Sequence, residues 1–188
     1  MVLENGYHSS MGKLHYKKEL VKSMKYLEKN KNVIFLGQSV KYSGNAIFST
    51  LKDISTKKKI ELPVFEETQM GLSIGLALSG YIPVTCYPRF DFLLCAMNQL
   101  VNHLDKIRIM SNNEFKPRVI IRTSIGPKKP LDGGVQHTQN YTKIFKNILT
   151  EINVVYLNDP KKIFKEYKKA LTRKDSKSTL LIENGHYL

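Results

Sequence analysis

The chain has 188 residues, of which 41% are hydrophobic and 24% are charged, and its formal net charge is +14. This length supplies one well-formed hydrophobic core and is short for two, so we expect a single domain. No apolar run approaches the roughly 18 residues that a membrane-spanning helix needs. The first residues also lack the basic and apolar blocks of a secretory signal, so we expect no membrane association and a cytoplasmic protein.

The positive charge comes mainly from lysine. Only five of the thirty basic residues are arginines, and the lysines are scattered along segments such as "HYKKELVKSMKYLEKNKN" and "DPKKIFKEYKKALTRKD". A basic surface attracts nucleic acid, but arginine is the usual reader of base edges and phosphates. The pattern is more typical of solvated helix faces, so nucleic-acid binding is the less favoured interpretation. Cys86 and Cys95 both stand in apolar surroundings, which predicts two buried thiols and no disulfide framework.

The first part of the chain alternates between helical and extended patterns. Residues 16–29 carry apolar side chains three or four apart, which predicts a helix, and "NVIFLG" (33–37 with the preceding Asn) predicts a buried strand. A short helix is expected near 46–54, followed by a brief extended segment at 60–65. The uncharged helix that comes next is expected over 67–79, with Gly80 placed to end it.

The second part repeats this alternation, and its elements are expected in a regular order. They are a strand at 81–87, the longest helical pattern at 90–110, a strand at 118–123, a loop rich in Gly and Pro at 124–139, a helix at 140–149, a strand at 152–157, a helix starting at Asp159-Pro160, and a strand at 178–183. Short apolar strands separated by helices predict an α/β fold with a mostly parallel sheet and helices on both faces.

Ligands of such sheets bind beyond the carboxyl ends of the strands, so the loops that follow the strands are the functional candidates. These loops contain no P-loop, no dinucleotide fingerprint and no nucleophile elbow, and the five histidines have no metal-ligand spacing. They do hold Glu66 before an uncharged helix, Phe90 and Phe92 after the next strand, and His137 within "GGVQHTQ". From the residues alone, the two rings are more often core residues and a lone histidine is more often structural.

These motifs carry a resemblance. In order and spacing, "PVFEETQMGLSIGLALSGYIPVTCYPRFDFLLCAMNQLVNH", "GGVQHTQ" and "TLLIENG" resemble the pyrimidine-binding domain of thiamine-diphosphate enzymes, within the transketolase-like superfamily. The pattern is most similar to the beta subunit of the 2-oxo-acid dehydrogenase decarboxylase component, and it covers residues 33–185. The resemblance implies the thiamine-diphosphate-binding fold.

The resemblance also implies roles for single residues. Glu66 matches the glutamate that hydrogen-bonds a ring nitrogen of the cofactor's aminopyrimidine and promotes its imino tautomer. A carboxylate in a pocket of low dielectric constant can hold the proton that this step needs. Phe92 matches the aromatic residue that packs on the aminopyrimidine, with Phe90 as its neighbour in the pocket wall. Glu67 is then a first-turn charge favoured by the helix dipole, and His137 matches a substrate-facing acid or hydrogen-bond donor.

Two family features are missing from the sequence. The Gly-Asp-Gly signature of the domain that holds Mg²⁺ and the diphosphate is not found in it, and we expect no C-terminal domain of the kind usual in beta subunits. The resemblance therefore implies an alpha-type partner subunit that binds the diphosphate through Mg²⁺. We expect a flexible segment at 1–14, a single pyrimidine-binding domain at 15–188, and a homodimer or heterotetramer. The helix at 68–79 is apolar nearly all round, which predicts that part of it is buried between subunits.

The expected function is that of a pyrimidine-binding subunit of a two-chain enzyme that decarboxylates a 2-oxo acid with acyl transfer. Two alternatives stay open: transketolase-type ketol transfer or carboligation on the same cofactor, and a non-catalytic binding module on this fold. Lys128 and Lys129 stand near the expected substrate entrance, where they would suit an anionic or phosphorylated substrate. By composition alone, they are more readily explained as solvated loop charges.

Overall fold

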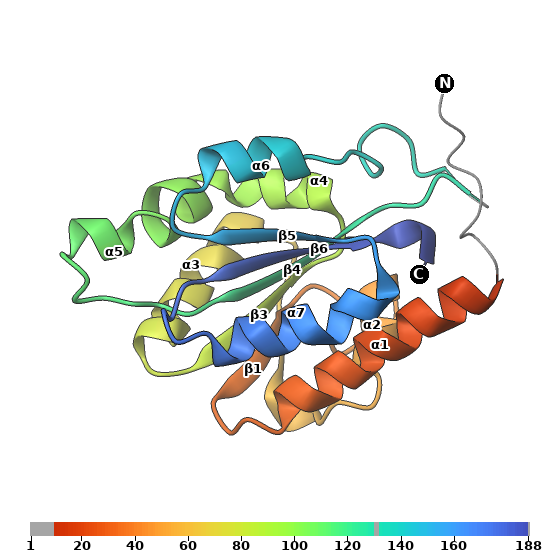
Figure 1. The fold of residues 1–188 in the computed structure, drawn as a ribbon, viewed down its shortest axis with the longest axis horizontal. Coiled ribbons are helices and arrows are strands. Elements are labelled where there is room, and N and C mark those ends of the chain that lie inside the picture. Colours follow the sequence, from red (N-terminus) through yellow and green to blue (C-terminus); the bar gives the residue numbers. More distant parts are fainter. Residues whose placement is uncertain (1–9, 130–131, 188) are drawn as a thin grey trace.

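The computed structural model describes residues 10–129 and 132–187. Helices and strands alternate through these residues (Figure 1). Their order is α1 (Ser10–Glu28), β1 (Val33–Gly37), α2 (Ala46–Leu51), η1 (Thr56–Lys58), β2 (Lys59–Glu61), α3 (Glu66–Leu78), β3 (Ile82–Tyr87), α4 (Phe90–Leu93), η2 (Leu94–Ala96), η3 (Asn98–Leu104), α5 (Ile107–Met110), β4 (Ile120–Ile125), α6 (Thr142–Ile148), β5 (Asn153–Leu157), α7 (Pro160–Thr172), β6 (Thr179–Asn184) and η4 (Gly185–Tyr187).

The six strands form one sheet in the order β2-β1-β3-β4-β6-β5, and every neighbouring pair is parallel. The predicted α/β class with a mostly parallel sheet is therefore confirmed. Because all strands run the same way, their carboxyl ends lie along one edge of the sheet, and the loops that follow them gather there. The path across the sheet reverses at β1, with β2 on one side and β3 on the other, which is the kind of switch point where ligands bind.

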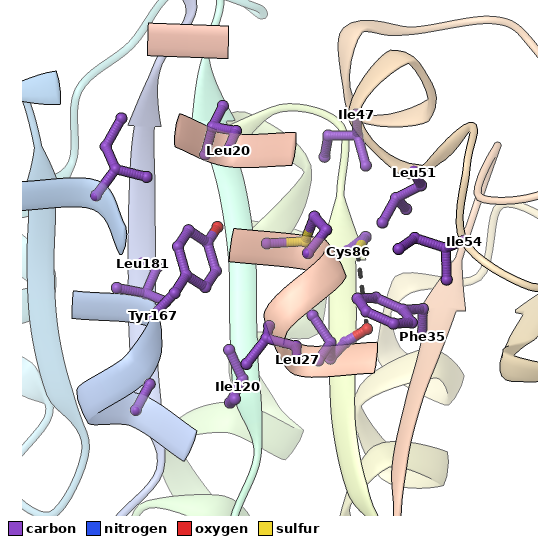
Figure 2. Packing of buried hydrophobic residues seen from close by; sticks show 14 of the residues in the cluster. Leu20, Leu27, Phe35, Ile47, Leu51, Ile54, Cys86, Ile120, Tyr167 and Leu181 are labelled. Atoms are coloured by element: carbon purple, nitrogen blue, oxygen red, sulfur yellow. Dashed lines mark hydrogen bonds between the residues drawn. The ribbon is translucent and has the colours of Figure 1, made fainter. Parts of the chain in front are cut away.

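Alternate strand residues face two separate cores. On one face, α1, α2 and α7 cover a cluster in which Phe35, Cys86, Ile120 and Leu181 from the strands meet Leu20 and Leu27 from α1 and Tyr167 from α7 (Figure 2). On the other face, the cluster combines Tyr87, Ile121 and Ile182 with residues of α3, α4, η3 and α6. Figure 1 shows α1 and α7 together on one side and α3, α4 and α6 on the other. The sheet is thus covered on both faces, as its apolar strands require.

A buried ion pair crosses the first of these cores. Arg122 donates from Nε to Glu183 Oε1 at 2.5 Å and from Nη2 to Glu183 Oε2 at 3.1 Å, and both side chains are fully buried. Thr50 accepts a second bond from Arg122 Nη2, and the Tyr167 hydroxyl donates to Glu183 at 2.6 Å. Burial alone would lower the pKa of Arg122, but the Glu183 carboxylate raises it above the ordinary value. The pair ties β4, β6, α2 and α7 together.

The structure corrects two expectations about single segments. Helix α1 begins at Ser10, before the start expected from the pattern at 16–29, whereas residues 1–9 lie outside the described part. Cys86 is buried as expected, but Cys95 is exposed, because Leu93 and Ala96 take the inward positions of that helical turn. Within the described residues, none of the helices is long and apolar enough to cross a membrane.

Candidate active site

The start of α3 is fixed by contacts with β3. Gln69 donates from Nε2 to Thr85 Oγ1 at 2.8 Å and to the Cys86 carbonyl at 3.0 Å. The Tyr87 hydroxyl donates to the backbone carbonyl of Glu66 at 3.2 Å. These bonds hold the first turn of α3 against the carboxyl end of a central strand, so the position of Glu66 is set by the sheet.

The two adjacent carboxylates of this turn have different surroundings. Glu67 accepts a hydrogen bond from Asn98 Nδ2 at 2.9 Å, which joins α3 to η3. Glu66 is half-buried, and its carboxylate makes no hydrogen bond or ion pair with the residues that the structure describes. Both lie in the first turn of a helix, where the dipole favours negative charge. Only Glu66 therefore has a carboxylate free to meet a ligand.

Phe92 of α4 and His137 of the loop after β4 are brought together. Their rings meet edge to face with centroids 5.3 Å apart and planes inclined at 80°. Both side chains are half-buried, so each keeps an accessible surface. Phe90 is placed differently: its ring is fully buried, 4.8 Å from Phe145 and 5.5 Å from Tyr141 between centroids. Phe90 thus belongs to the core beneath α4, and its side chain is not part of an open pocket wall.

Glycines allow the His137 loop to lie close to the sheet edge. The Gly126 N–H donates to the His137 carbonyl at 3.0 Å, and the His137 N–H donates to the Gly134 carbonyl at 3.0 Å. A Cβ on Gly126 would collide with that carbonyl oxygen, and one on Gly133 would lie 3.0 Å from the His137 Cβ. Gly134 has φ +82°, a left-handed conformation that other residues rarely adopt. The glycine-rich loop therefore holds the histidine in place through its backbone.

The loop after β1 is anchored by the carboxylate of Glu61. Glu61, the last residue of β2, accepts hydrogen bonds from the backbone N–H groups of Ser39 at 2.5 Å, Val40 at 2.9 Å and Lys41 at 2.7 Å. This arrangement fixes the loop after β1 beside the start of α3. Sequence reasoning did not identify Glu61, because nothing in its local pattern shows that a distant turn points three N–H groups toward it.

Arg89 is a second residue that sequence reasoning did not assign to the site. It follows β3 directly, is half-buried, and donates from Nη1 to the Pro88 carbonyl at 2.9 Å. The same carbonyl accepts from Ser124 Oγ at 2.8 Å. The Arg89 Nε lies 3.1 Å from the position that a Cβ on Gly126 would take. Arg89 follows the carboxyl end of the strand that was expected at 81–87. Because most basic residues of the sequence are solvated lysines, this position did not stand out.

An apolar surface runs along α3 and the adjoining η2. Leu72 and Leu78 of α3, Tyr81 after it and Leu94 of the adjoining η2 are 39%, 46%, 46% and 39% exposed. We call these four residues the α3 surface. Gly75 stands on the same helix and has no other atom within 4 Å of the place where a Cβ would be. Exposed apolar side chains gathered on one helix are typical of a protein interface.

No group of three His, Cys, Asp or Glu side chains among residues 10–129 and 132–187 is arranged to hold a metal ion. The candidate site therefore consists of a free carboxylate at the start of α3, a half-exposed aromatic ring in α4 with the histidine of the loop after β4, and the arginine that precedes α4. All four follow the carboxyl ends of strands. Such a set can exchange a proton, pack on a planar ring and bind an anion.

This fold and arrangement of loops define a thiamine-diphosphate-type α/β domain, and comparison identifies its class. Residues 21–186 match the family described as "Transketolase, pyrimidine binding domain". The chain belongs to this family.

Among curated relatives, the pyruvate dehydrogenase E1 component subunit beta of Gracilaria tenuistipitata var. liui is 29% identical over 126 residues, which are 65% of this chain and 38% of that protein. The 2-oxoisovalerate dehydrogenase subunit beta of Bacillus subtilis (strain 168) is 27% identical over 124 residues, 64% of this chain and 37% of that protein. The chain thus spans well under half the length of these relatives.

Solved structures show the same fold. A split-gene transketolase, described as an inactive beta4 tetramer, superposes with a TM-score of 0.56 and 19% identity, covering 90% of this chain and 49% of that one. A transketolase from Leishmania mexicana superposes with a TM-score of 0.64 and 14% identity, covering 90% of this chain and 24% of that one. At these identities the likeness concerns the fold alone.

Proposed function

We propose that this chain is the pyrimidine-binding subunit of a two-chain thiamine-diphosphate enzyme that decarboxylates a 2-oxo acid and transfers the acyl group. The names of the curated relatives support the 2-oxo-acid chemistry, and the family match supports the domain type. The observation that carries the proposal is Glu66, a half-buried carboxylate at the start of α3 that is held in place by β3 and has no partner within the described chain.

The residues present fit the aminopyrimidine half of the cofactor. The unpaired Glu66 carboxylate is an acceptor, or a donor when protonated, for a ring nitrogen. The half-exposed ring of Phe92 offers a flat apolar surface on which an aminopyrimidine packs. When bound, thiamine diphosphate supplies a nucleophilic thiazolium carbon, whereas this chain supplies the groups around it.

Each side chain has a separate task in this proposal. Glu66 exchanges a proton with the aminopyrimidine from a position that its own backbone and Tyr87 fix. Phe92 orients the ring and holds His137 by the edge-to-face contact. His137 donates a hydrogen bond to the substrate, since its half-buried imidazole keeps an accessible surface. Phe90 packs in the core against Phe145 and Tyr141 and does not touch the cofactor.

The diphosphate and its Mg²⁺ are held, in this proposal, by an alpha-type partner subunit. The α3 surface is the place where that subunit, or a second copy of this chain, covers the helix, because four partly exposed apolar side chains there are otherwise left in water. The working form is then at least a heterotetramer, with this chain contributing residues 15–188 as one domain. A homodimer is the form expected without the partner.

Transketolase-type ketol transfer or carboligation is the second candidate, and the description of the matching family, "Transketolase, pyrimidine binding domain", supports it. The two reactions use the same cofactor and the same Glu66, so they differ in the substrate and its acceptor. A panel containing pyruvate, branched 2-oxo acids, and a ketose phosphate with an aldose phosphate separates them once the partner is present.

The test of the proposal is calorimetry with thiamine diphosphate and Mg²⁺. The chain alone should bind the cofactor very weakly, and affinity should rise when a diphosphate-binding partner chain is added. Tight Mg²⁺-dependent binding by the isolated chain would show that the division of the site is wrong. No cofactor binding and no turnover with the partner present would favour a non-catalytic binding module instead.

A further inference from the structure

Four of the five arginines are engaged in holding the fold together. Two of them pair side-on with carboxylates through the Nε and Nη2 edge of the guanidinium: Arg122 with Glu183, and Arg173 with Asp175 at 2.8 and 2.6 Å. The other two donate to backbone carbonyls, Arg118 to residues 171 and 173, and Arg108 to residue 175.

Arg89 uses its guanidinium differently. Its hydrogen bond runs from Nη1 to the carbonyl of the preceding Pro88, and it forms no ion pair within 4 Å among the described residues. The Nε and Nη2 edge, which Arg122 and Arg173 present to carboxylates, has no hydrogen-bond partner within residues 10–129 and 132–187. Because the two N–H groups of this edge match two oxygens of a carboxylate or phosphate, Arg89 can bind an oxyanion through it.

The guanidinium is held in one place. The Pro88 carbonyl that receives Nη1 also accepts from Ser124 Oγ, so it is fixed between β3 and β4. Gly126, at the end of β4, leaves the space in which Arg89 Nε lies, and the Gly126 N–H binds the His137 carbonyl. Arg89 therefore lies beside the backbone that positions His137, on the same sheet edge as Phe92.

The charge of Arg89 is incompletely compensated. Burial lowers the pKa of Arg89, and the Asp91 carboxylate counteracts part of this effect from a distance. Asp91 itself accepts a bond from the Tyr141 hydroxyl at 3.3 Å and forms no ion pair with Arg89 within 4 Å. A cation withdrawn partly from water gains most from a ligand of opposite charge. The exposed Lys128 and Lys129 on the following loop add positive potential there.

We propose that Arg89 binds an anionic group of the substrate, a carboxylate or a phosphate, and so determines which substrates the site accepts. The nature of the reaction rests on the proposed function. The binding of an anion by Arg89 does not depend on it. Arg89 pairs side-on with the oxyanion through Nε and Nη2, while Nη1 stays on Pro88. The reacting end of the substrate then lies toward His137 and Phe92.

The first experiment measures anion binding by the full chain without cofactor. At low ionic strength, inorganic phosphate and pyruvate are titrated separately while NMR follows the Arg89 Nε–H and the His137 ring. We expect saturable shifts in the wild type, at least tenfold weaker binding in Arg89→Gln, and partial rescue in Arg89→Lys, which keeps the charge and loses the planar fork. Lys57→Gln, an exposed lysine of η1, is the charge-matched control and should bind as the wild type does.

Two outcomes would overturn the inference: no saturable shift with either anion, or equal binding by Arg89→Gln and the wild type. Circular dichroism checks that the variants are folded. Ser124→Ala tests the placement of Arg89 indirectly, because it removes the hydrogen bond that fixes the Pro88 carbonyl. In the assembled enzyme, Arg89→Gln should raise KM for pyruvate about tenfold or more, whereas Lys57→Gln should leave it nearly unchanged. A failure of the cofactor experiment leaves the titration result intact, so the two proposals fail separately.

Discussion

The ring of Phe92 contacts the imidazole of His137 edge to face, with 5.3 Å between centroids, and this contact joins the turn after β3 to the loop after β4. The Gly126 N–H holds the same loop from the backbone side. With the bond from the His137 N–H to the Gly134 carbonyl included, one aromatic contact and two main-chain bonds place the histidine. All three contacts are made within the chain itself.

Phe90 and Phe92 provide a matched pair for testing this arrangement. Phe90→Leu should lower the free energy of unfolding by about 1–1.5 kcal/mol, because the ring is fully buried among aromatic neighbours. Phe92→Leu should change stability less and weaken cofactor binding in the assembled enzyme by about 1 kcal/mol, the usual contribution of ring stacking. Urea denaturation and calorimetry measure the two effects. Equal loss of cofactor affinity in both variants would contradict the assignment of Phe90 to the core.

The paired carboxylates supply the test of proton exchange. Glu66→Gln keeps the shape and a hydrogen bond but cannot exchange the proton, so turnover in the reconstituted complex should fall by about 10²–10⁴. Glu67→Gln should change turnover little, since its carboxylate serves the first turn of α3 and the bond from Asn98. The measurement is proton exchange at the thiazolium carbon at saturating cofactor. The reverse pattern would place the catalytic carboxylate at Glu67, and no effect in either variant would exclude the catalytic proposal.

The α3 surface makes a prediction about assembly. Leu72→Glu or Leu78→Glu should abolish binding of the partner subunit while the chain alone remains folded, because both side chains are already partly exposed. Ile144→Glu on α6 is the control, since Ile144 is 58% exposed and lies outside this surface. Sedimentation of the mixed subunits measures the complex. Normal assembly in both Leu variants would show that the partner binds elsewhere.

Gly75 tests the same helix without adding charge. In the isolated chain, Gly75→Ala should raise the free energy of unfolding by about 0.5–1 kcal/mol, because alanine is the better helix former and nothing lies within 4 Å of the added Cβ. Denaturant unfolding of the chain alone is the measurement. A destabilised variant would mean that Gly75 is already covered, for instance by a second copy of the chain.

Local signals of the sequence predicted much of the fold. Asp159 and Pro160 were expected to start a helix, and Asp159 Oδ1 accepts from the Lys161 N–H at 3.0 Å at the beginning of α7. Gly80 was expected to end α3, and it has φ +90°. Such positions depend on a few neighbouring residues, so their chemistry is visible in the sequence.

Other features depend on how distant segments meet. The long helical pattern at 90–110 predicted one helix, but the structure divides it into α4, η2, η3 and α5, with Asp105 N bonded to the Leu100 carbonyl five residues back. The spacing of apolar residues indicates which side chains face the core. It does not indicate which backbone carbonyl each N–H bonds. For the same reason Phe90 and Phe92 look alike in the sequence, whereas in α4 their side chains leave different sides of the helix and only Phe90 is fully buried. Arg89 could be recognised only once β3 and β4 were placed side by side.

Asp105 gives the final prediction, which concerns stability and pH. Its side chain is fully buried and accepts from the backbone N–H groups of Thr150, Glu151 and Ile152 and from the Thr150 hydroxyl, so it ties η3 to the start of β5. Burial by itself would raise the pKa of Asp105, but the bond to Lys106 and the backbone N–H groups outweigh it, and the pKa lies below the ordinary value.

A lowered pKa in the folded state means that the carboxylate contributes stability above its ordinary pKa and that this contribution is lost as the pH falls through the folded value. Asp105→Asn should therefore lower the free energy of unfolding by about 2–3 kcal/mol at pH 7, the range for hydrogen bonds to a charged acceptor. The difference from the wild type should shrink below about pH 4, where the ordinary aspartate is protonated. Urea denaturation across this pH range measures both, with Glu114→Gln as an exposed control. If the difference in free energy of unfolding between the wild type and Asp105→Asn stayed constant from pH 7 to below about pH 4, the charge of Asp105 would not stabilise the fold.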